Sequence, residues 1–178
     1  MTHAASTLLA RPDIASFRSA MGRFPTGVTL LTQGSGDETL VTTLNSFVSV
    51  SLDPLLVLVS VKADGQIRPR VIRRQSFAVN VLTEPQRDLA QEFSRSDRSQ
   101  GQAAMLRLAA VDGVTGNAVM PGAEAYFECG LHQAYDAGDH VLLIGRVVAL
   151  RAGAGEADPL VFHQGRFRRL PAELGEAA

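Results

Sequence analysis

The chain has 178 residues, of which 46% are hydrophobic and 20% are charged, and its 17 basic and 18 acidic residues leave a net charge of −1. This length predicts one domain with a core of its own. The near-neutral charge excludes a general nucleic-acid binder and a protein that coats anionic membranes, because both need surplus positive charge. Cys129 is the only cysteine, which excludes an intrachain disulfide and a thiolate-rich metal site and favours a reducing compartment.

The N-terminal segment has neither the basic region nor the long apolar run of a signal peptide. The most apolar windows, 55–61 and 141–150, are far shorter than the roughly 20 residues that a membrane helix needs. We therefore expect a cytoplasmic protein with no membrane partner. Residues 1–12 are predicted to be a frayed terminus, residues 13–170 the domain and residues 171–178 a tail.

Residues 13–61 predict one helix followed by strands. Asp13 can cap a helix in which Ile14, Phe17, Met21 and Phe24 recur at spacings of three and four. The expected strands are 28–32 and 39–43, which form a hairpin, then 45–51 and 55–61. Alternation of small polar and apolar side chains predicts that 45–51 is half buried. The nearly unbroken aliphatic run at 55–61 predicts a strand that is buried on both faces.

After residue 61 the sequence predicts helices at 66–74 and 85–93 and a mobile polar loop at 94–105. The expected strands are 77–82, 107–111, 124–134, 140–150 with a bulge at Gly145, 160–162 and 166–170. A turn at 135–139 joins the two longest. Short strands joined mostly by turns, with two or three short helices, argue against a doubly wound parallel sheet. They favour a closed or nearly closed antiparallel barrel.

Catalytic motifs of common enzyme classes are missing from the sequence, including the phosphate-binding Walker loop and the GxSxG nucleophile elbow. His132, His140 and His163 lie apart without a carboxylate at ligand spacing, so we expect no metal site. Cys129 lies on the apolar phase of its strand and is predicted to be a buried small hydrophobe. Arginine-rich runs at 68–74 and 166–169 are either solvated charge or a clamp for phosphate. Taken alone, the residues predict a β-barrel domain, with a phosphorylated cofactor as the ligand that the arginines would favour.

Six blocks of sequence add a more specific signal: FRxAMxxFPTGV at 17–28, TLNSFxSVSLDP at 43–54, FAVNVL at 77–82, FS at 93–94, GDHxLLxGRV at 138–147 and PLVFHxGRF at 159–167. In this order they resemble the short-chain flavin reductase family, the reductase components of two-component flavin monooxygenases. The resemblance runs from about residue 14 to about residue 170.

The resemblance implies a mainly β protein with peripheral helices, built as a six-stranded antiparallel flavin-binding split barrel with Greek-key character. It further implies a homodimer that binds FMN or FAD near the subunit interface, with NADH or NADPH docking over the flavin ring. A hydride would pass from the nicotinamide to flavin N5, and reduced flavin would diffuse to a separate oxygenase component. The alternative is a non-catalytic or repurposed split-barrel protein that binds flavin or another ligand without turning over nicotinamide.

The resemblance also assigns site residues. His140 would lie near the nicotinamide and orient it or donate a proton. Ser94 and Arg95 would approach the flavin phosphate. The other residues expected around the flavin are Pro25, Thr26, Gly27, Thr43, Leu44, Asn45, Ser46, Ser49 and Phe167. The alternative for 43–46 is a polar strand that lines a wet face, and on local evidence alone 25–27 is equally a helix terminator.

One segment departs from the family pattern. After 55–61 the family usually offers a Ser/Thr-rich loop to the flavin phosphate, whereas this chain has KADGQIR at 62–68. Asp64 carries the wrong charge for that role, so Lys62, Gln66 or Arg68 would have to substitute. The altered loop favours the non-catalytic alternative, and the intact GDH block at 138–140 favours the enzyme. His163 also stands at a position where the family commonly has a phenol side chain. The resemblance therefore does not determine which residues form the far wall of the pocket.

Overall fold

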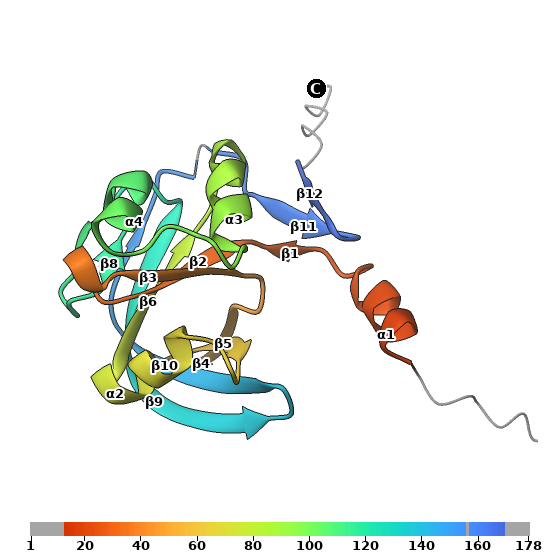
Figure 1. Cartoon of the computed structure of the whole chain (residues 1–178), viewed down its shortest axis with the longest axis horizontal. Coiled ribbons are helices and arrows are strands. Elements are labelled where there is room, and N and C mark those ends of the chain that lie inside the picture. Colours follow the sequence, from red (N-terminus) through yellow and green to blue (C-terminus); the bar gives the residue numbers. More distant parts are fainter. Residues whose placement is uncertain (1–12, 156, 170–178) are drawn as a thin grey trace, which may run out of the picture.

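Seven antiparallel strands form one strongly curved sheet in the computed structural model, which describes residues 13–155 and 157–169 (Figure 1). The order across the sheet is β3-β2-β6-β9-β10-β5-β4. The bounds are β2 (Thr29–Gln33), β3 (Leu40–Leu44), β4 (Val48–Leu52), β5 (Leu55–Lys62), β6 (Ser76–Val81), β9 (Ala125–Ala137) and β10 (His140–Ala152).

Smaller elements decorate this sheet. A three-stranded sheet has the order β1-β11-β12, and β7 pairs with β8. The short strands are β1 (Thr26–Gly27), β7 (Val111–Asp112), β8 (Ala118–Val119), β11 (Val161–His163) and β12 (Arg166–Arg168). The helices are α1 (Ile14–Met21), α2 (Ile67–Arg74), α3 (Arg87–Phe93) and α4 (Gly101–Leu108), with 3-10 turns η1 (Gly36–Glu38) and η2 (Glu84–Gln86). None of the helices in the described ranges is long and apolar enough to cross a bilayer.

The barrel is split between β3 and β5, which approach each other without forming a ladder. A single serine joins the two sides just beyond β3. Ser46 Oγ accepts a hydrogen bond from the Ser60 N–H at 3.0 Å and donates one to the Ser60 carbonyl at 3.1 Å. The expected split barrel is therefore confirmed, but its sheet has seven strands where six were predicted, because β4 folds back on β5 as an added hairpin.

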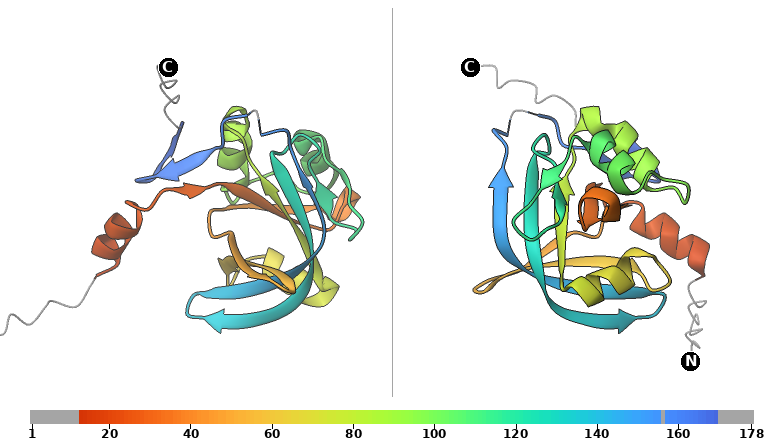
Figure 2. Two further views of the ribbon diagram at one scale, coloured as in Figure 1. Left: turned by 180° about the vertical axis from the view of Figure 1, so that it is seen from behind. Right: turned by 60° about the vertical axis from the view of Figure 1, so that its left-hand side comes forward.

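Two apolar clusters lie on opposite sides of β2, where Leu30 and Leu31 point in opposite directions. Leu31 packs inside the barrel with Phe77 and Leu143, and α2 covers that end of the barrel (Figure 2). Leu30 packs in the second cluster, beneath α3 and α4 at the other end. As a result β2 is fully buried, whereas β5 alternates: Val57, Val59 and Val61 are at most 5% exposed and the residues between them are partly exposed. The prediction that 55–61 is buried on both faces was wrong.

The predicted first helix is confirmed, but it buries none of its residues. Asp13 Oδ1 accepts a hydrogen bond from the Ser16 N–H at 2.7 Å and so caps α1. The apolar residues Ile14, Phe17, Met21 and Phe24 are nevertheless between 53% and 72% exposed. Helix α1 stands away from the barrel, beyond the β1-β11-β12 sheet (Figure 1). Its apolar face is therefore unpartnered in the single chain.

Other boundaries differ from the prediction for identifiable reasons. The strand expected at 45–51 begins only at Val48, because residues 45–47 cross the split, and β4 is mostly exposed. The mobile loop expected at 94–105 and the strand at 107–111 are replaced by a shorter loop and α4. This helix is formed by the strong helix formers of GQAAMLRL, with Ala104 and Leu108 buried four residues apart. Strand β9 continues to Ala137, so the turn expected at 135–139 is reduced to Gly138 and Asp139.

The predicted irregularity at Gly145 is confirmed by a register shift between Ile144 and Gly145 in the β9-β10 ladder. Gly145 is buried against the ring of Phe77 and the side chain of Cys129. A Cβ atom on residue 145 would lie only 2.8 Å from the Cβ of Cys129. The glycine is therefore required by close packing in the barrel core.

Candidate functional site

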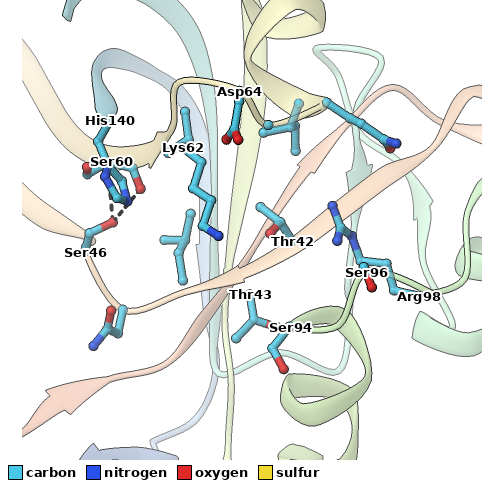
Figure 3. Close-up of a pocket in the computed structure, with 16 residues that line it drawn as sticks. Thr42, Thr43, Ser46, Ser60, Lys62, Asp64, Ser94, Ser96, Arg98 and His140 are labelled. Carbon is cyan, nitrogen blue, oxygen red and sulfur yellow. Dashed lines mark hydrogen bonds between the residues drawn. The ribbon is translucent and has the colours of Figure 1, made fainter. Parts of the chain in front are cut away.

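A cavity of about 460 Å³ opens at the split between β3 and β5 (Figure 3). This volume falls in the range of roughly 300–1,000 Å³ that is usual for small-molecule sites. Five parts of the chain contribute its lining: the end of β3 and the next loop, the end of β5, the loop into α2, the segment after α3, and the start of β10. The lining residues are Thr42, Thr43, Leu44, Asn45, Ser46, Ser60, Val61, Lys62, Asp64, Gly65, Gln66, Ile67, Ser94, Ser96, Arg98 and His140.

The β3 side of the cavity offers mainly main-chain groups. Thr43 Oγ1 already donates to the Ala90 carbonyl at 2.8 Å, which ties β3 to α3, and Ser46 Oγ is engaged with Ser60. In the described ladders, however, β3 pairs only with β2. An edge of this kind presents N–H and C=O groups that can bind the polar edge of a flat heterocycle.

Positive charge dominates the opposite walls. Arg98 Nε donates to the Val41 carbonyl at 2.7 Å and Nη1 to the Arg95 carbonyl at 2.7 Å. A guanidinium has five N–H donors, so three remain for a ligand. Within the described ranges, neither Arg98 nor Lys62 forms an ion pair. The exposed carboxylate of Asp64 opposes these two cations but is outnumbered by them. The cavity is therefore suited to an anionic group such as phosphate.

His140 is the first residue of β10 and lies beside Ser46 and Ser60 in the close-up (Figure 3). Its Nδ1 atom is 2.8 Å from Oδ1 of Asp139. The hydrogen bond and charge of His140 hold the pKa of the Asp139 carboxyl below its usual value. Since Nδ1 faces Asp139, Nε2 is the nitrogen left to contact a ligand.

Eight of the residues predicted around the cofactors line this one cavity. They are Thr43, Leu44, Asn45, Ser46, Lys62, Gln66, Ser94 and His140. Four regions that are separated in the sequence, 43–46, 62–66, 94 and 140, therefore meet at one cavity. Their roles in binding stay predictions.

The other predicted site residues lie elsewhere. Pro25 precedes β1, and Thr26 and Gly27 form it, pairing with β11; Ser49 is exposed on β4. Arg68 donates to the Ala63 carbonyl and pairs with Asp136 at 3.3 Å. Arg95 is paired with Asp97 at 2.7 Å. Phe167 packs edge-on against Phe162. In a single chain none of these lines the cavity.

Several lining residues were missed from the sequence, chiefly Ser60, Ser96 and Arg98. Ser60 interrupts an otherwise aliphatic strand, which is a recognisable signal. Ser94, Ser96 and Arg98 alternate along a polar segment, and this alternation could have indicated that they face one side. The resemblance assigned Arg95 to the flavin phosphate, but the arginine that lines the cavity is Arg98, three residues later.

These features fit a flavin better than a metal. Among the residues described, no three His, Cys, Asp or Glu side chains are grouped as a metal ion would require. The unused donors of Arg98, the cation of Lys62 and the free edge of β3 match a phosphate-bearing, planar, hydrogen-bonding ligand.

Comparison with known proteins places the chain in a family. The model of the flavin reductase like domain matches residues 21–171. The chain belongs to this family. It is 44% identical over 159 residues to the NADH-dependent FMN reductase AsuE2 of Streptomyces nodosus subsp. asukaensis, across 89% of this chain and 86% of that protein. It is 38% identical over 169 residues to an NADH-dependent FAD reductase of Streptomyces globisporus, across 92% of this chain and 90% of that protein.

Solved structures agree with this assignment. BorF, the flavin reductase component of a bacterial two-component tryptophan halogenase, superposes with a TM-score of 0.83 at 40% identity, over 89% of this chain and 99% of that chain. The NADH:FAD oxidoreductase SgcE6 of Streptomyces globisporus, in complex with NAD and FAD fragments, gives a TM-score of 0.81 at 35% identity, over 91% of this chain and 95% of that chain. The split-barrel fold of this family member is thus shared along nearly its whole length.

Proposed function

We propose that this protein is an NAD(P)H-dependent flavin reductase that transfers a hydride from reduced nicotinamide to FMN or FAD in the cavity at the split of the barrel. The observation that carries the proposal is the convergence of eight predicted cofactor residues on that cavity, in a chain that belongs to the flavin reductase like family. The relatives named above use NADH, so NADH is the nicotinamide that we expect this protein to prefer.

The residues of the cavity have to place two ring systems, and they need no strong acid, base or nucleophile. When bound, the flavin supplies N5 as the hydride acceptor. The main chain of 42–44 would donate to the ring carbonyls, where electron density rises as the ring is reduced. Lys62 and Arg98 would hold the phosphate. His140 would contact the nicotinamide through Nε2 and so orient it toward the acceptor.

The protein is expected to act as a homodimer. Its support is the unpartnered apolar face of α1, formed by Ile14, Phe17 and Met21. A second apolar strip lies on β4, where the side chains of Val48, Val50 and Leu52 are between 49% and 83% exposed. Apolar surfaces of this kind on a small protein usually mark an interface, and a two-fold dimer is the commonest way to cover one.

Reduced flavin is the product, and a separate flavin-dependent oxygenase is its expected consumer. The BorF reductase serves a two-component halogenase, and another relative is the reductase component of a trigonelline monooxygenase from Acinetobacter baylyi. The use of NADH would place the reaction in the cytoplasm.

A flavin-binding protein without reductase activity is the second candidate, and Asp64 is the observation that favours it. The carboxylate lines the cavity in a loop that lacks the hydroxyls expected there. A negative charge beside a phosphate weakens binding. In this case the cavity would hold a less charged ligand, or hold flavin without productive nicotinamide docking.

The absorbance of NADH or NADPH, followed with FMN or FAD and the purified protein, separates the two candidates. A flavin reductase makes the absorbance fall much faster than the free reagents do, and without oxygen it accumulates bleached, reduced flavin. If none of the four pairs reacts faster with the protein, the reductase proposal is overturned. Flavin binding in that same sample would then support the non-catalytic candidate.

A further inference from the structure

The segment that carries Ser94, Ser96 and Arg98 into the cavity has little apolar anchoring of its own. This segment, residues 94–100, is called the strap below. It connects the end of α3 to the start of α4, and five of its seven residues are exposed. Its position must therefore come from hydrogen bonds, since exposed polar chain has almost no buried surface to fix it.

Glu92, in the last turn of α3, makes two of the contacts that determine where the strap lies. Its Oε1 accepts a hydrogen bond from Ser99 Oγ at 2.8 Å, and its Oε2 accepts one from Arg107 Nε of α4 at 2.7 Å. One carboxylate thus joins α3, the strap and α4. Burial raises the pKa of the Glu92 carboxyl, but the hydrogen bonds from Ser99 and Arg107 outweigh burial, so the net pKa lies below the usual value. Glu92 is therefore ionised at neutral pH and its hydrogen bonds are charge-assisted.

The strap in turn aims Arg98 at the cavity. Arg98 donates to the Val41 carbonyl on β3 and to the Arg95 carbonyl within the strap. Ser99, the residue held by Glu92, directly follows Arg98. A shift of the strap at Ser99 would therefore move the guanidinium whose remaining donors face the cavity.

We propose that Glu92 is a positioning residue for phosphate recognition: by holding Ser99 and Arg107 it fixes the strap so that Arg98 presents its free N–H groups to the flavin phosphate. Glu92 does not line the cavity, so it acts through Arg98 and not by touching the ligand. This inference rests on the proposed function, because it takes the anion in the cavity to be a flavin phosphate.

The test compares two glutamates at opposite ends of the same helical segment. Glu84 pairs with Arg87 at 2.7 Å and has 28% side-chain exposure, against 26% for Glu92, but it contacts neither the strap nor the cavity. Glu92→Gln and Glu84→Gln are purified with the wild type. Binding of FMN and of riboflavin, which lacks the phosphate, is measured by quenching of flavin fluorescence. Amide hydrogen exchange of 94–100 is followed in the absence of flavin.

Glu92→Gln is expected to weaken FMN binding about tenfold, which is the value of one charge-assisted hydrogen bond between Arg98 and the phosphate. Riboflavin binding should stay within about twofold and strap exchange should quicken, because the ring-binding wall is untouched and only the strap is released. In turnover the KM for FMN should rise with kcat preserved at saturation. Glu92→Asp, which keeps the charge on a shorter stem, should recover part of the FMN affinity. Glu84→Gln should behave as wild type.

Three results would overturn the inference: unchanged FMN binding in Glu92→Gln, equal weakening of FMN and riboflavin, or the same effect in Glu84→Gln. A failure of the proposed function looks different. In that case the wild-type protein itself shows no flavin-dependent oxidation of NADH, whatever the strap variants do.

Discussion

Nδ1 of His140 and Oδ1 of Asp139 lie 2.8 Å apart at the turn between the two longest strands of the barrel. The histidine side chain is 38% exposed and lines the cavity, whereas the aspartate side chain is 94% exposed and points away into solvent. The contact fixes the ring so that Nε2 is directed to whatever occupies the cavity. The last residue of a tight turn thus orients the ligand-facing side chain of the first residue of the next strand.

We expect His140→Ala to impair the use of the nicotinamide more than the binding of flavin. The imidazole lies at the start of β10, away from the strap and its arginine, so its loss should raise the KM for NADH about tenfold, the typical value of one hydrogen bond to a bound ligand. The Kd for FMN should change by less than about twofold. His132→Ala, an exposed histidine on β9 that does not line the cavity, is the control. Equal losses of NADH and FMN binding, or no loss of either, contradict the role given to His140.

Arg98→Gln should weaken FMN binding roughly 10- to 100-fold and leave riboflavin binding nearly unchanged, because the side chain is expected to bind only the phosphate. Arg95→Gln is the matched control, since Arg95 lies in the same strap but is paired with Asp97 and does not line the cavity. Quenching of flavin fluorescence measures both. A stronger effect of Arg95→Gln would restore the sequence-based assignment of the phosphate site to Arg95.

These two arginines show how far the sequence alone reaches. Helix α3 and its exit were predicted, which located this wall of the cavity to within a few residues. The alternation of Ser94, Ser96 and Arg98 favours Arg98, but the contact that places its guanidinium is with the Val41 carbonyl on β3, which no local pattern encodes. Likewise, the β3 segment was found from its motif, but the Ser46–Ser60 hydrogen bonds join the loop after β3 to β5 across the split. Side-chain periodicity predicts strands and faces, whereas long-range pairing decides which of them meet.

Helix α4 illustrates the opposite error, in which local polarity concealed a helix. The run SRSDRSQGQ predicted a loop as far as residue 105, yet the helix begins at Gly101 because Ala104 and Leu108 are buried in the cluster beneath α3. Tertiary burial of two small or aliphatic side chains therefore outweighed a polar and glycine-containing start.

Phe17→Asp should convert the expected dimer to a monomer. Phe17 is 62% exposed on the apolar face of α1, and a charge buried in an apolar interface without a partner is strongly unfavourable. Sedimentation velocity on the variant and the wild type measures the change. Val114→Asp, which alters a valine that is 81% exposed in the turn after β7, should leave the mass unchanged. A wild-type protein that sediments as a monomer would refute the homodimer.

Gly145→Ala should destabilise the protein by about 1–3 kcal/mol, the usual cost of overpacking a core. The new methyl group would press on the ring of Phe77 and the side chain of Cys129. Gly130→Ala is a control from the facing strand, where a Cβ atom meets nothing within 4 Å. Chemical denaturation gives the free energy of unfolding of each variant. Similar losses in both would contradict the packing argument, because a methyl group on residue 130 has no neighbour to press on and the lower entropy of the unfolded chain favours alanine.

Cys129 should be inert in the folded protein and should make stability depend on alkaline pH. Burial, helped by the charge of Glu128, raises the pKa of its thiol to about 12. In the unfolded chain the pKa of the thiol is about 8.5. Below its unfolded pKa the thiol is protonated in both states, so the full stability of the fold is present. As the pH rises from there toward the folded pKa, the unfolded chain releases a proton that the folded protein keeps, and the free energy of unfolding falls.

The free energy of unfolding should accordingly fall between about pH 8.5 and 12, by at most about 1.4 kcal/mol per pH unit from this group. Cys129→Ala should remove that part of the slope, since the other titrating side chains are the same in both proteins. Iodoacetamide at pH 8 should leave the native thiol unmodified and alkylate it rapidly in denaturant, because only the thiolate of an accessible cysteine reacts. Rapid alkylation of the native protein, or an identical alkaline slope in Cys129→Ala, would show that the thiol is not held in the dry interior between β6 and β10.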